Sequence, residues 1–377
     1  MFSQGRPNER LPGLPDKVID LTLVNDEVSL LEFRLEYLGP HVDQHVVVSA
    51  DVTHGGQPKA FLEPATLVGK SVSPISLLHL KVPEAILRLG DRWAIEEFSR
   101  AWLLDFSRKS FKGNPVFLLC DIDEIPSREQ VQEIRASRHF FPVKSIPMFT
   151  SYFSVNLLDY GGRPNWVKAK AVSWRSNNPA PRFAYAPKIR ANPGQHLRYL
   201  NFTHTQFSKK LEDFAHSELD RGQEFKESLF KDAFENGLRP VPELESSPLG
   251  LLAIANASEL SEVARSYLLK DPDCLSSPEN FPSISRRVSR AKRLMNGRFR
   301  QAEGLSGDTR FRWPKEESEL GRLFARGRRV MTRLSKELGQ RPPGRSWLHV
   351  AMGVNHYGGW KNNPPVTDFS RHDVAPR

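Results

Sequence analysis

The sequence predicts an α/β fold in which helices flank a buried sheet with parallel strands. Short apolar or β-branched runs at 17–24, 46–48, 75–82 and 116–120 alternate with helical patterns, as in proteins built around such a sheet. Hydrophobic residues make up 39% of the chain and include 23 Phe and 7 Trp, which is enough for a sizeable core. The length of 377 residues exceeds one average domain of roughly 100–200 residues. We therefore expect one large domain with an appendage, or two domains.

The first 82 residues contain three predicted strands and one helix. Residues 1–16 are polar and include three prolines, which predicts a flexible leader. Residues 17–24 form a β-branched apolar run typical of a buried strand. A helical pattern at 27–38 follows, and further strands are predicted at 46–48 and 75–82.

A long helix and a short strand come next. Asp91 stands in the N-cap position of an amphipathic helix at 92–107, and the apolar run VFLLC at 116–120 predicts a strand. Ser127 followed by Glu129 and Gln130 indicates another capped helix. Beyond residue 140 we expect strands within 144–158 and 166–174 and a helix at 208–219.

Basic residues are concentrated in the C-terminal third. Residues 286–345 hold 18 Lys and Arg against six Asp and Glu, a net charge of +12, whereas the whole chain carries +10. We expect a domain at 17–245 and a basic, mainly helical extension at 246–377. This extension is a solvated surface or docks on an anionic membrane. Nucleic-acid binding is not expected, because no recognisable module for it is present.

The chain shows no signal for membrane insertion or for a disulfide framework. No apolar run approaches the roughly 18–20 residues that span a bilayer, and the first residues lack the apolar segment of a signal peptide. The two cysteines, Cys120 and Cys274, are too few for a disulfide framework or a cysteine zinc site. We expect a cytoplasmic protein, at most peripheral to a membrane.

The most informative motif is Asp121-Ile122-Asp123-Glu124, directly after the apolar run VFLLC. A strand of a parallel sheet ends at the edge where α/β proteins bind ligands. Two carboxylates at positions i and i+2 of an extended segment lie on one side and can share a divalent cation. Such a cation neutralises a diphosphate as its bond to a sugar breaks. The alternative is a chance DxD sequence without a metal.

Several segments resemble glycosyltransferase family 17. LLCDIDEIPSREQVQEI at 118–134 is similar to the Asp-Val-Asp-Glu-Ile-Pro segment of that family, and NDEVSLLEFRL at 25–35 resembles its opening. Further similar segments lie at 46–59, at GQHL (194–197) and at KLEDFAHSELD (210–220), and Trp93, Glu97 and Arg100 match its pattern before the acidic strand. These matches occur in family order between residues 18 and 240.

The resemblance implies a GT-A-like, Rossmann-type mixed sheet and an inverting, metal-dependent glycosyltransferase. It implies transfer of a sugar, N-acetylglucosamine, from a nucleotide-sugar donor such as UDP-GlcNAc to a glycan acceptor, with Mn²⁺ or Mg²⁺. The expected metal ligands are Asp121, Asp123, His196 and His216. The expected donor contacts are Asp121, Glu32, Arg34, Lys59 and Arg100. The expected catalytic base, which takes the proton of the acceptor hydroxyl, is Glu218 or Asp220.

Each of these roles has a structural alternative. Either histidine could be a packed or surface residue, and Glu218 and Asp220 could be solvated charges at a helix end. Arg100 could hold Glu97 in an ion pair, and Glu124 could cap the turn after the motif. The aromatic side chains that could form a floor under a sugar ring are more often core residues; these are Tyr152, Phe153, Trp166 and Trp174.

Two residues differ from the family pattern, and the sequence leaves two other functions as alternatives. Ser49 replaces a family Glu and Gln195 replaces a family Trp, so substrate choice differs if either residue touches a substrate. One alternative function is a catalytically silent relative that binds a glycan or an anionic lipid. The other is a phosphohydrolase with Asp121 as the phosphoryl acceptor.

Overall fold

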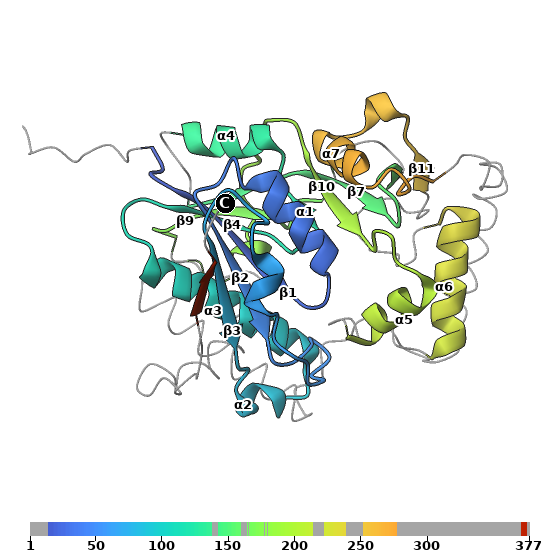
Figure 1. Ribbon diagram of the computed structural model, residues 1–377, viewed down its shortest axis with the longest axis horizontal. Coiled ribbons are helices and arrows are strands. Elements are labelled where there is room, and N and C mark those ends of the chain that lie inside the picture. Colours follow the sequence, from blue (N-terminus) through green and yellow to red (C-terminus); the bar gives the residue numbers. More distant parts are fainter. Residues whose placement is uncertain are drawn as a thin grey trace, which may run out of the picture. The chain divides into compact units, whose positions relative to one another are not determined.

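A computed structural model shows how these segments fold. It describes residues 14–137, 142–159, 164, 166–176, 178, 180–213, 222–238, 252–276 and 371–374. All of the elements below belong to one compact unit, which Figure 1 colours along the sequence.

The first sheet has seven strands. Their order across the sheet is β12-β3-β2-β1-β4-β9-β6. The bounds are β1 Val18–Val24, β2 Gln44–Ala50, β3 Ile75–Leu80, β4 Val116–Leu119, β6 Val143–Ser145, β9 Lys170–Ser173 and β12 Arg371–Val374.

The centre of this sheet is parallel and its flanks are antiparallel. Strand β1 pairs in parallel with β2 and β4, and β2 pairs in parallel with β3. The strands β9, β6 and β12 join with antiparallel pairings. All four residues of β4 are buried, as expected for a strand covered on both faces. The predicted α/β class with a mixed sheet is confirmed.

The second sheet has five strands in the order β11-β8-β7-β10-β5. Strand β10 pairs in parallel with β7 and antiparallel with β5, and the other pairings are antiparallel. The bounds are β5 Glu124–Ile125, β7 Met148–Tyr152, β8 Leu157–Asp159, β10 Gly194–Arg198 and β11 Leu252–Ile254.

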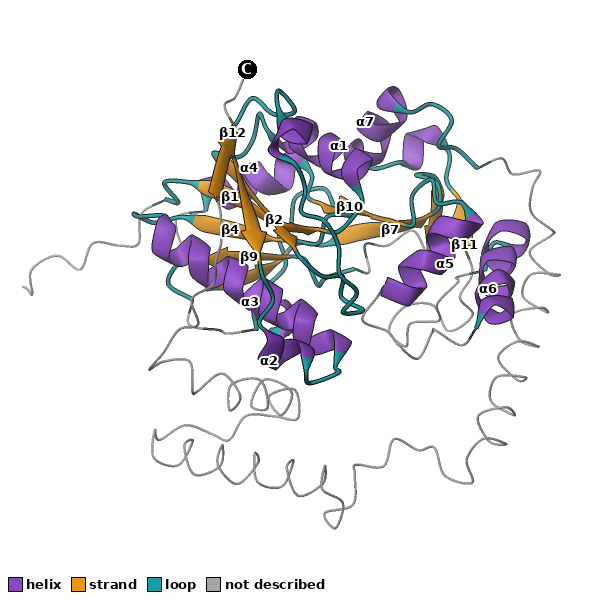
Figure 2. Cartoon of the chain, turned by 60° about the horizontal axis from the view of Figure 1, so that its bottom comes forward, coloured by secondary structure: helices purple, strands orange, loops and turns teal. Residues whose placement is uncertain are grey.

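Helices cover both faces of the first sheet. Figure 2 shows α1 and α4 on one face and α3 on the other, with α5 and α6 beside the second sheet. The bounds are α1 Val28–Leu38, α2 Glu84–Leu87, α3 Arg92–Ser110, α4 Arg128–Ala136, α5 His204–Asp213, α6 Gln223–Asn236 and α7 Glu262–Lys270. Among the described residues, 3₁₀ turns lie at Pro64–Leu67, Pro181–Phe183 and Ala257–Glu259.

The predicted helix caps form as expected. The side chain of Asp91 accepts a hydrogen bond from the Trp93 backbone N–H at 2.9 Å. Ser127 and Gln130 make a reciprocal capping box at the start of α4. This cap fixes the chain direction directly after the acidic motif.

Some predicted boundaries differ from the structure. The strand expected at 166–174 is confined to β9, because residues 167–169 leave the sheet. Helix α5 begins at His204, four residues before the predicted start, because the side chains of Thr203 and Gln206 satisfy its first backbone N–H groups. Residues 214–219 of that predicted helix lie outside the described residues.

The four aromatic residues considered for a sugar floor separate into two groups. Tyr152 and Phe153 are core residues, exposed by only 1% and 4%. Trp174 is 40% exposed, and its indole N–H donates to Asn114. Trp166 lies against His196, with ring centroids 4.4 Å apart, so of the four it is the one near the acidic motif.

The predicted division of the chain at residue 245 stays a prediction. In the structure β11 pairs with β8, and α7 contacts β10 and α1. The basic segment 286–345 lies outside the described residues. Within the part of the chain that the structure describes, no helix combines the length and hydrophobicity needed to cross a bilayer.

Candidate active site

The acidic motif lies in one of the connections between the two sheets. Strand β4 of the first sheet ends at Leu119, and β5 of the second sheet begins at Glu124. The turn between them is closed by hydrogen bonds in both directions: the Glu124 N–H donates to the Asp121 carbonyl at 3.0 Å, and the Asp121 N–H donates to the Glu124 carboxylate at 2.7 Å. The turn therefore holds both aspartates at the carboxyl edge of the parallel strands.

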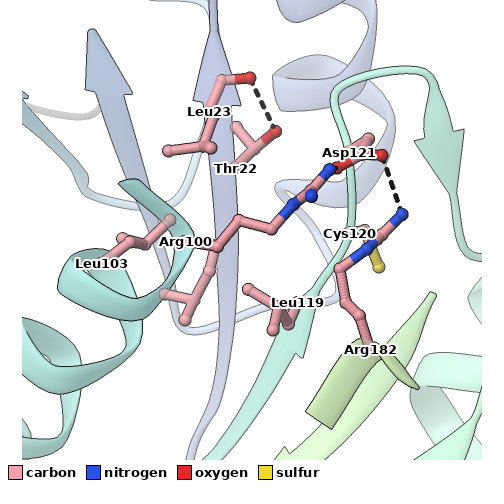
Figure 3. A pocket seen from close by; sticks show the side chains of 9 residues that line it. Thr22, Leu23, Arg100, Leu103, Leu119, Cys120, Asp121 and Arg182 are labelled. Carbon is pink, nitrogen blue, oxygen red and sulfur yellow. Dashed lines mark hydrogen bonds and ion pairs between the residues drawn. The ribbon is translucent and has the colours of Figure 1, made fainter. Parts of the chain in front are cut away.

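Two arginines hold the Asp121 carboxylate. Arg100 of α3 donates to Oδ1 at 2.7 Å, and Arg182 donates to Oδ2 at 2.8 Å. Figure 3 shows both side chains pointing toward Asp121. Burial by itself raises the pKa of Asp121, but the two guanidinium groups hold that pKa well below its usual range. Asp121 is therefore ionised, and each of its oxygens accepts a hydrogen bond from one arginine, while its side chain remains 32% exposed.

The Asp123 carboxylate is less constrained. Its side chain is 25% exposed and lies 3.4 Å from Nε2 of His196, which β10 supplies. Burial raises the pKa of Asp123, whereas His196 and, more weakly, Lys210 lower it, and the result lies below the usual range. Asp123 is thus a negative charge that remains accessible to a ligand.

Glu124 points away from solvent and ties the motif to its surroundings. Its side chain is fully buried and accepts hydrogen bonds from Arg182 at 2.6 Å and from the Trp166 indole at 2.5 Å. Arg182 therefore bridges Asp121 and Glu124. Glu124 also accepts the Asp121 N–H, so it closes the turn of the motif itself, whereas the alternative role predicted for it was to cap the turn after the motif.

Arg34 lies behind the motif, on α1. It is fully buried and forms a two-point ion pair with Asp20 of β1, at 2.6 and 3.0 Å. Its remaining nitrogen, Nη1, donates to the backbone carbonyls of Asp121 at 2.9 Å and Glu124 at 2.7 Å. His45 Nδ1 lies 2.9 Å from the Asp20 carboxylate. The core of the first sheet thereby holds the backbone of the acidic turn.

Asp20→Asn is expected to destabilise the protein by about 3–5 kcal/mol at pH 7, because it leaves the Arg34 charge buried without its partner. Burial raises the pKa of Asp20, but Arg34 and then His45 hold it well below its usual range. Stability from such a group is present above the unfolded pKa of about 3.9 and is lost as the pH falls below it. The difference between the wild type and the variant should therefore shrink by about 1 kcal/mol from pH 5 to pH 3. Urea unfolding at both pH values measures it, and a constant difference would contradict the prediction.

A cavity of about 990 Å³ opens in front of the motif. The ends of β1 and β2, the first turn of α1, and parts of α3, β10 and α5 line it. The side chains of Asp121, Asp123, His196, Arg100 and Lys59 are among those on its wall. Its place at the carboxyl ends of parallel strands is where α/β sheets bind ligands, and its volume is at the upper end of that of ligand pockets.

The profile of glycosyltransferase family 17 matches residues 9–232, which is more than half of the chain. This chain belongs to glycosyltransferase family 17. The match includes β1 to β4, the acidic turn, β10 and α5, so every described element that carries the predicted site lies within it.

Curated proteins match a shorter stretch. The beta-1,4-mannosyl-glycoprotein 4-beta-N-acetylglucosaminyltransferase of Homo sapiens is 31% identical over 124 residues, and the protein of the same name from Rattus norvegicus is 30% identical over 124 residues. The matched stretch is 31% of this chain and 23% of each relative. The chain thus spans less than a quarter of the length of the curated relatives it matches.

The structure of this family 17 chain brings only some predicted site residues together. Asp121, Asp123, His196, Arg100 and Lys59 share the cavity. Lys59 donates to the backbone carbonyls of Val24 at 3.3 Å and Asn25 at 3.1 Å. Arg100 pairs with Glu96 as well as Asp121, rather than with the predicted Glu97.

Glu32 and Arg34 do not line the cavity. Glu32 forms an ion pair with Lys70 at 2.9 Å, and Arg34 is sealed behind the acidic turn. The direct donor contact predicted for Arg34 is wrong, because its side chain has no exposed surface. The other predicted site residues, His216, Glu218 and Asp220, lie outside the described residues.

The two residues that differ from the family pattern, Ser49 and Gln195, do not line the cavity. Ser49 is fully buried and accepts a hydrogen bond from the Leu62 N–H at 3.0 Å. Gln195 is fully buried and accepts one from the Ser261 hydroxyl at 2.8 Å, at the start of α7. Both replacements therefore serve internal packing in this family 17 chain.

Sequence reasoning missed two cationic residues of the site. Arg182 lies 61 positions after Asp121, in a proline-rich segment without periodicity, so no pattern in the sequence predicts its ion pairs. Lys210 begins the segment KLEDFAHSELD, which resembles the family, but the segment alone does not indicate which of its side chains faces the cavity.

Proposed function

We propose that this chain is an inverting glycosyltransferase that moves N-acetylglucosamine from a nucleotide-sugar donor to a glycan acceptor, with Mn²⁺ or Mg²⁺ bound. The single observation that carries the proposal is the ionised, accessible Asp123 on a large cavity at the carboxyl edge of the parallel strands. Membership of family 17 and the name of the curated relatives support the reaction type and the sugar.

The side chains present fit a divalent cation held by few protein ligands. Asp123 offers a partly exposed carboxylate beside His196, whose Nδ1 is buried without a hydrogen-bond partner among the described residues. Asp121 is occupied by its two arginines. Within the described part of the chain no group of three or more His, Cys, Asp or Glu side chains is arranged around a metal position. Mg²⁺ is often held by one or two carboxylates plus substrate phosphates, which suits Asp123 as the carboxylate that the protein contributes.

The reaction itself requires charge stabilisation and one proton acceptor. The bond between the anomeric carbon and the diphosphate oxygen breaks, and its electron pair leaves on the diphosphate. The acceptor hydroxyl oxygen bonds to the same carbon from the opposite face, and its proton passes to a carboxylate, for which Glu218 or Asp220 stays the prediction. A bound divalent cation supplies positive charge to the departing diphosphate.

The phosphohydrolase alternative is disfavoured by the contacts of Asp121. Arg100 and Arg182 each donate to one oxygen of Asp121, and their two positive charges make this carboxylate a weaker nucleophile for an attack on phosphorus. Contact of residues 286–345 with an anionic membrane is a further proposal, based on their net charge of +12.

Removing divalent metal is expected to lower sugar transfer at least tenfold, because the diphosphate would then face the Asp123 charge without neutralisation. The purified chain is incubated with UDP-GlcNAc and N-glycan acceptors, and UDP release and glycan mass are followed before and after treatment with EDTA. Added Mn²⁺ or Mg²⁺ should restore transfer. Undiminished transfer in EDTA would contradict the requirement for a metal. If the chain neither transferred sugar from UDP-, GDP- or dTDP-sugars nor hydrolysed them, the proposed function would be contradicted.

A further inference from the structure

Helix α5 reaches from the second sheet to the turn between β1 and α1, at the cavity. Lys209 of α5 lies 3.5 Å from the Asp26 carboxylate, and Lys210 forms an ion pair with Glu27. Arg92 of α3 donates to the backbone carbonyl of Glu212 at 2.7 Å, near the end of α5. The Lys210–Glu27 pair and the Arg92 contact hold Lys210 on the cavity wall, whereas the longer, exposed pair of Lys209 contributes little.

Lys210 lines the same cavity as the accessible aspartate, Asp123. Its side chain is 23% exposed, compared with 64% for Lys209. Burial lowers the pKa of Lys210, but the carboxylates of Glu27 and then Asp123 raise it above its ordinary value. The lysine therefore stays charged at neutral pH, and it faces the cavity that Asp123 also lines.

Glu27, the present partner of Lys210, also accepts hydrogen bonds from backbone N–H groups. Oε1 of Glu27 faces Lys210, whereas Oε2 accepts from the backbone N–H groups of Asn25 and Asp26, each at 3.3 Å. When Lys210 turns away, Glu27 keeps these two donors. The cost of breaking the ion pair is thereby reduced.

Two other cations beside the acidic motif are committed to carboxylates. Arg100 is paired with Glu96 and Asp121, and Arg182 with Asp121 and Glu124. Releasing either one would leave a buried carboxylate with one partner fewer. A lysine, in contrast, carries a compact charge on a flexible stem and can change partners by rotating its side chain.

We propose that Lys210 exchanges Glu27 for the diphosphate of a nucleoside diphosphate sugar and is a catalytic residue that stabilises the leaving group. This inference rests on the proposed function. As the bond from the anomeric carbon to the diphosphate oxygen breaks, the diphosphate gains the electron pair and one negative charge. The ammonium group of Lys210 pairs with that charge without giving up its proton.

The test compares Lys210→Met with Lys209→Met, a matched change at the neighbouring, exposed lysine. Lys210→Met should lower kcat for UDP-GlcNAc about 100-fold, in the range typical for loss of one charge-stabilising donor. Its affinity for UDP, measured by calorimetry with Mn²⁺ present, should fall at least tenfold. Lys209→Met should stay within about threefold of the wild type in both, and Lys210→Arg should recover part of the lost kcat.

The outcomes separate the two proposals. If the wild type is active and Lys210→Met has the same kcat and the same affinity for UDP, the role of Lys210 is overturned and the proposed function stands. An equal loss of kcat and UDP affinity in Lys209→Met and Lys210→Met would also overturn the role of Lys210. Any weakening of the contacts of α5 would then be enough to explain the loss. Absence of turnover and of UDP binding in the wild type would overturn the proposed function and this inference with it.

Discussion

Asp123→Asn is expected to reduce sugar transfer about 1000-fold, the upper end of what the loss of one charge-stabilising group costs. The substitution keeps the shape of the side chain but removes the charge that faces the cavity. Because Asp123 is 25% exposed and its contact with His196 is 3.4 Å long, the free energy of unfolding should change by less than about 1 kcal/mol. Initial rates with UDP-GlcNAc and Mn²⁺, together with a urea unfolding curve, measure both effects.

A matched control is Asp105→Asn on the outer side of α3. Asp105 is 61% exposed and pairs with Lys109, so its replacement should leave the rate within about twofold of the wild type. If Asp123→Asn retained a tenth or more of the wild-type rate, Asp123 would not be the charge on which the reaction depends. A loss of rate accompanied by unfolding would show that the residue is structural instead.

Arg34→Met is expected to lower the free energy of unfolding by about 3–5 kcal/mol, because breaking a buried ion pair leaves the other charge without a partner. Both Arg34 and Asp20 have side chains with no exposed surface. The variant also removes the hydrogen bonds to the carbonyls of Asp121 and Glu124, which leaves buried acceptors unsatisfied. Urea unfolding at pH 7 measures the loss.

The control for this prediction is Arg88→Met in α2. Arg88 also pairs with a carboxylate, Glu84, but both side chains are 74% exposed, so the expected change is below about 0.5 kcal/mol. Similar unfolding curves for the two variants would contradict the buried ion pair as a main support of the acidic turn.

The local elements of this fold were predictable where a pattern repeats within a few residues. Strand β4 is apolar at every position and β1 at five of seven, and the Ser127 capping box is a signal of four residues. The expected strand at 166–174 was less well defined, since β9 spans only four residues. Its length depends on pairing with β4 and β6, which are distant in sequence.

The candidate site was predictable in part for the same reason. Asp121 and Asp123 come just after the end of an apolar strand in the sequence, which made them recognisable. The partners of Asp121, in contrast, come from α3 and from a turn 61 residues later. Arg34 illustrates the opposite error: it was expected to contact the donor, but burial directs its charge to Asp20 and to the backbone of the turn. Charge is a property of the sequence, and accessibility is a property of the fold.

The sequence by itself therefore determined the α/β class, the acidic turn at the end of β4 and the resemblance to family 17, because each depends on residues close together in the chain. Only the tertiary structure decided that Asp121 is paired with two arginines, that Asp123 stays accessible beside His196, and that Lys210 reaches the cavity. Those three results arise from pairings between distant segments, and the fraction of each side chain that remains exposed depends on how the two sheets and α5 pack.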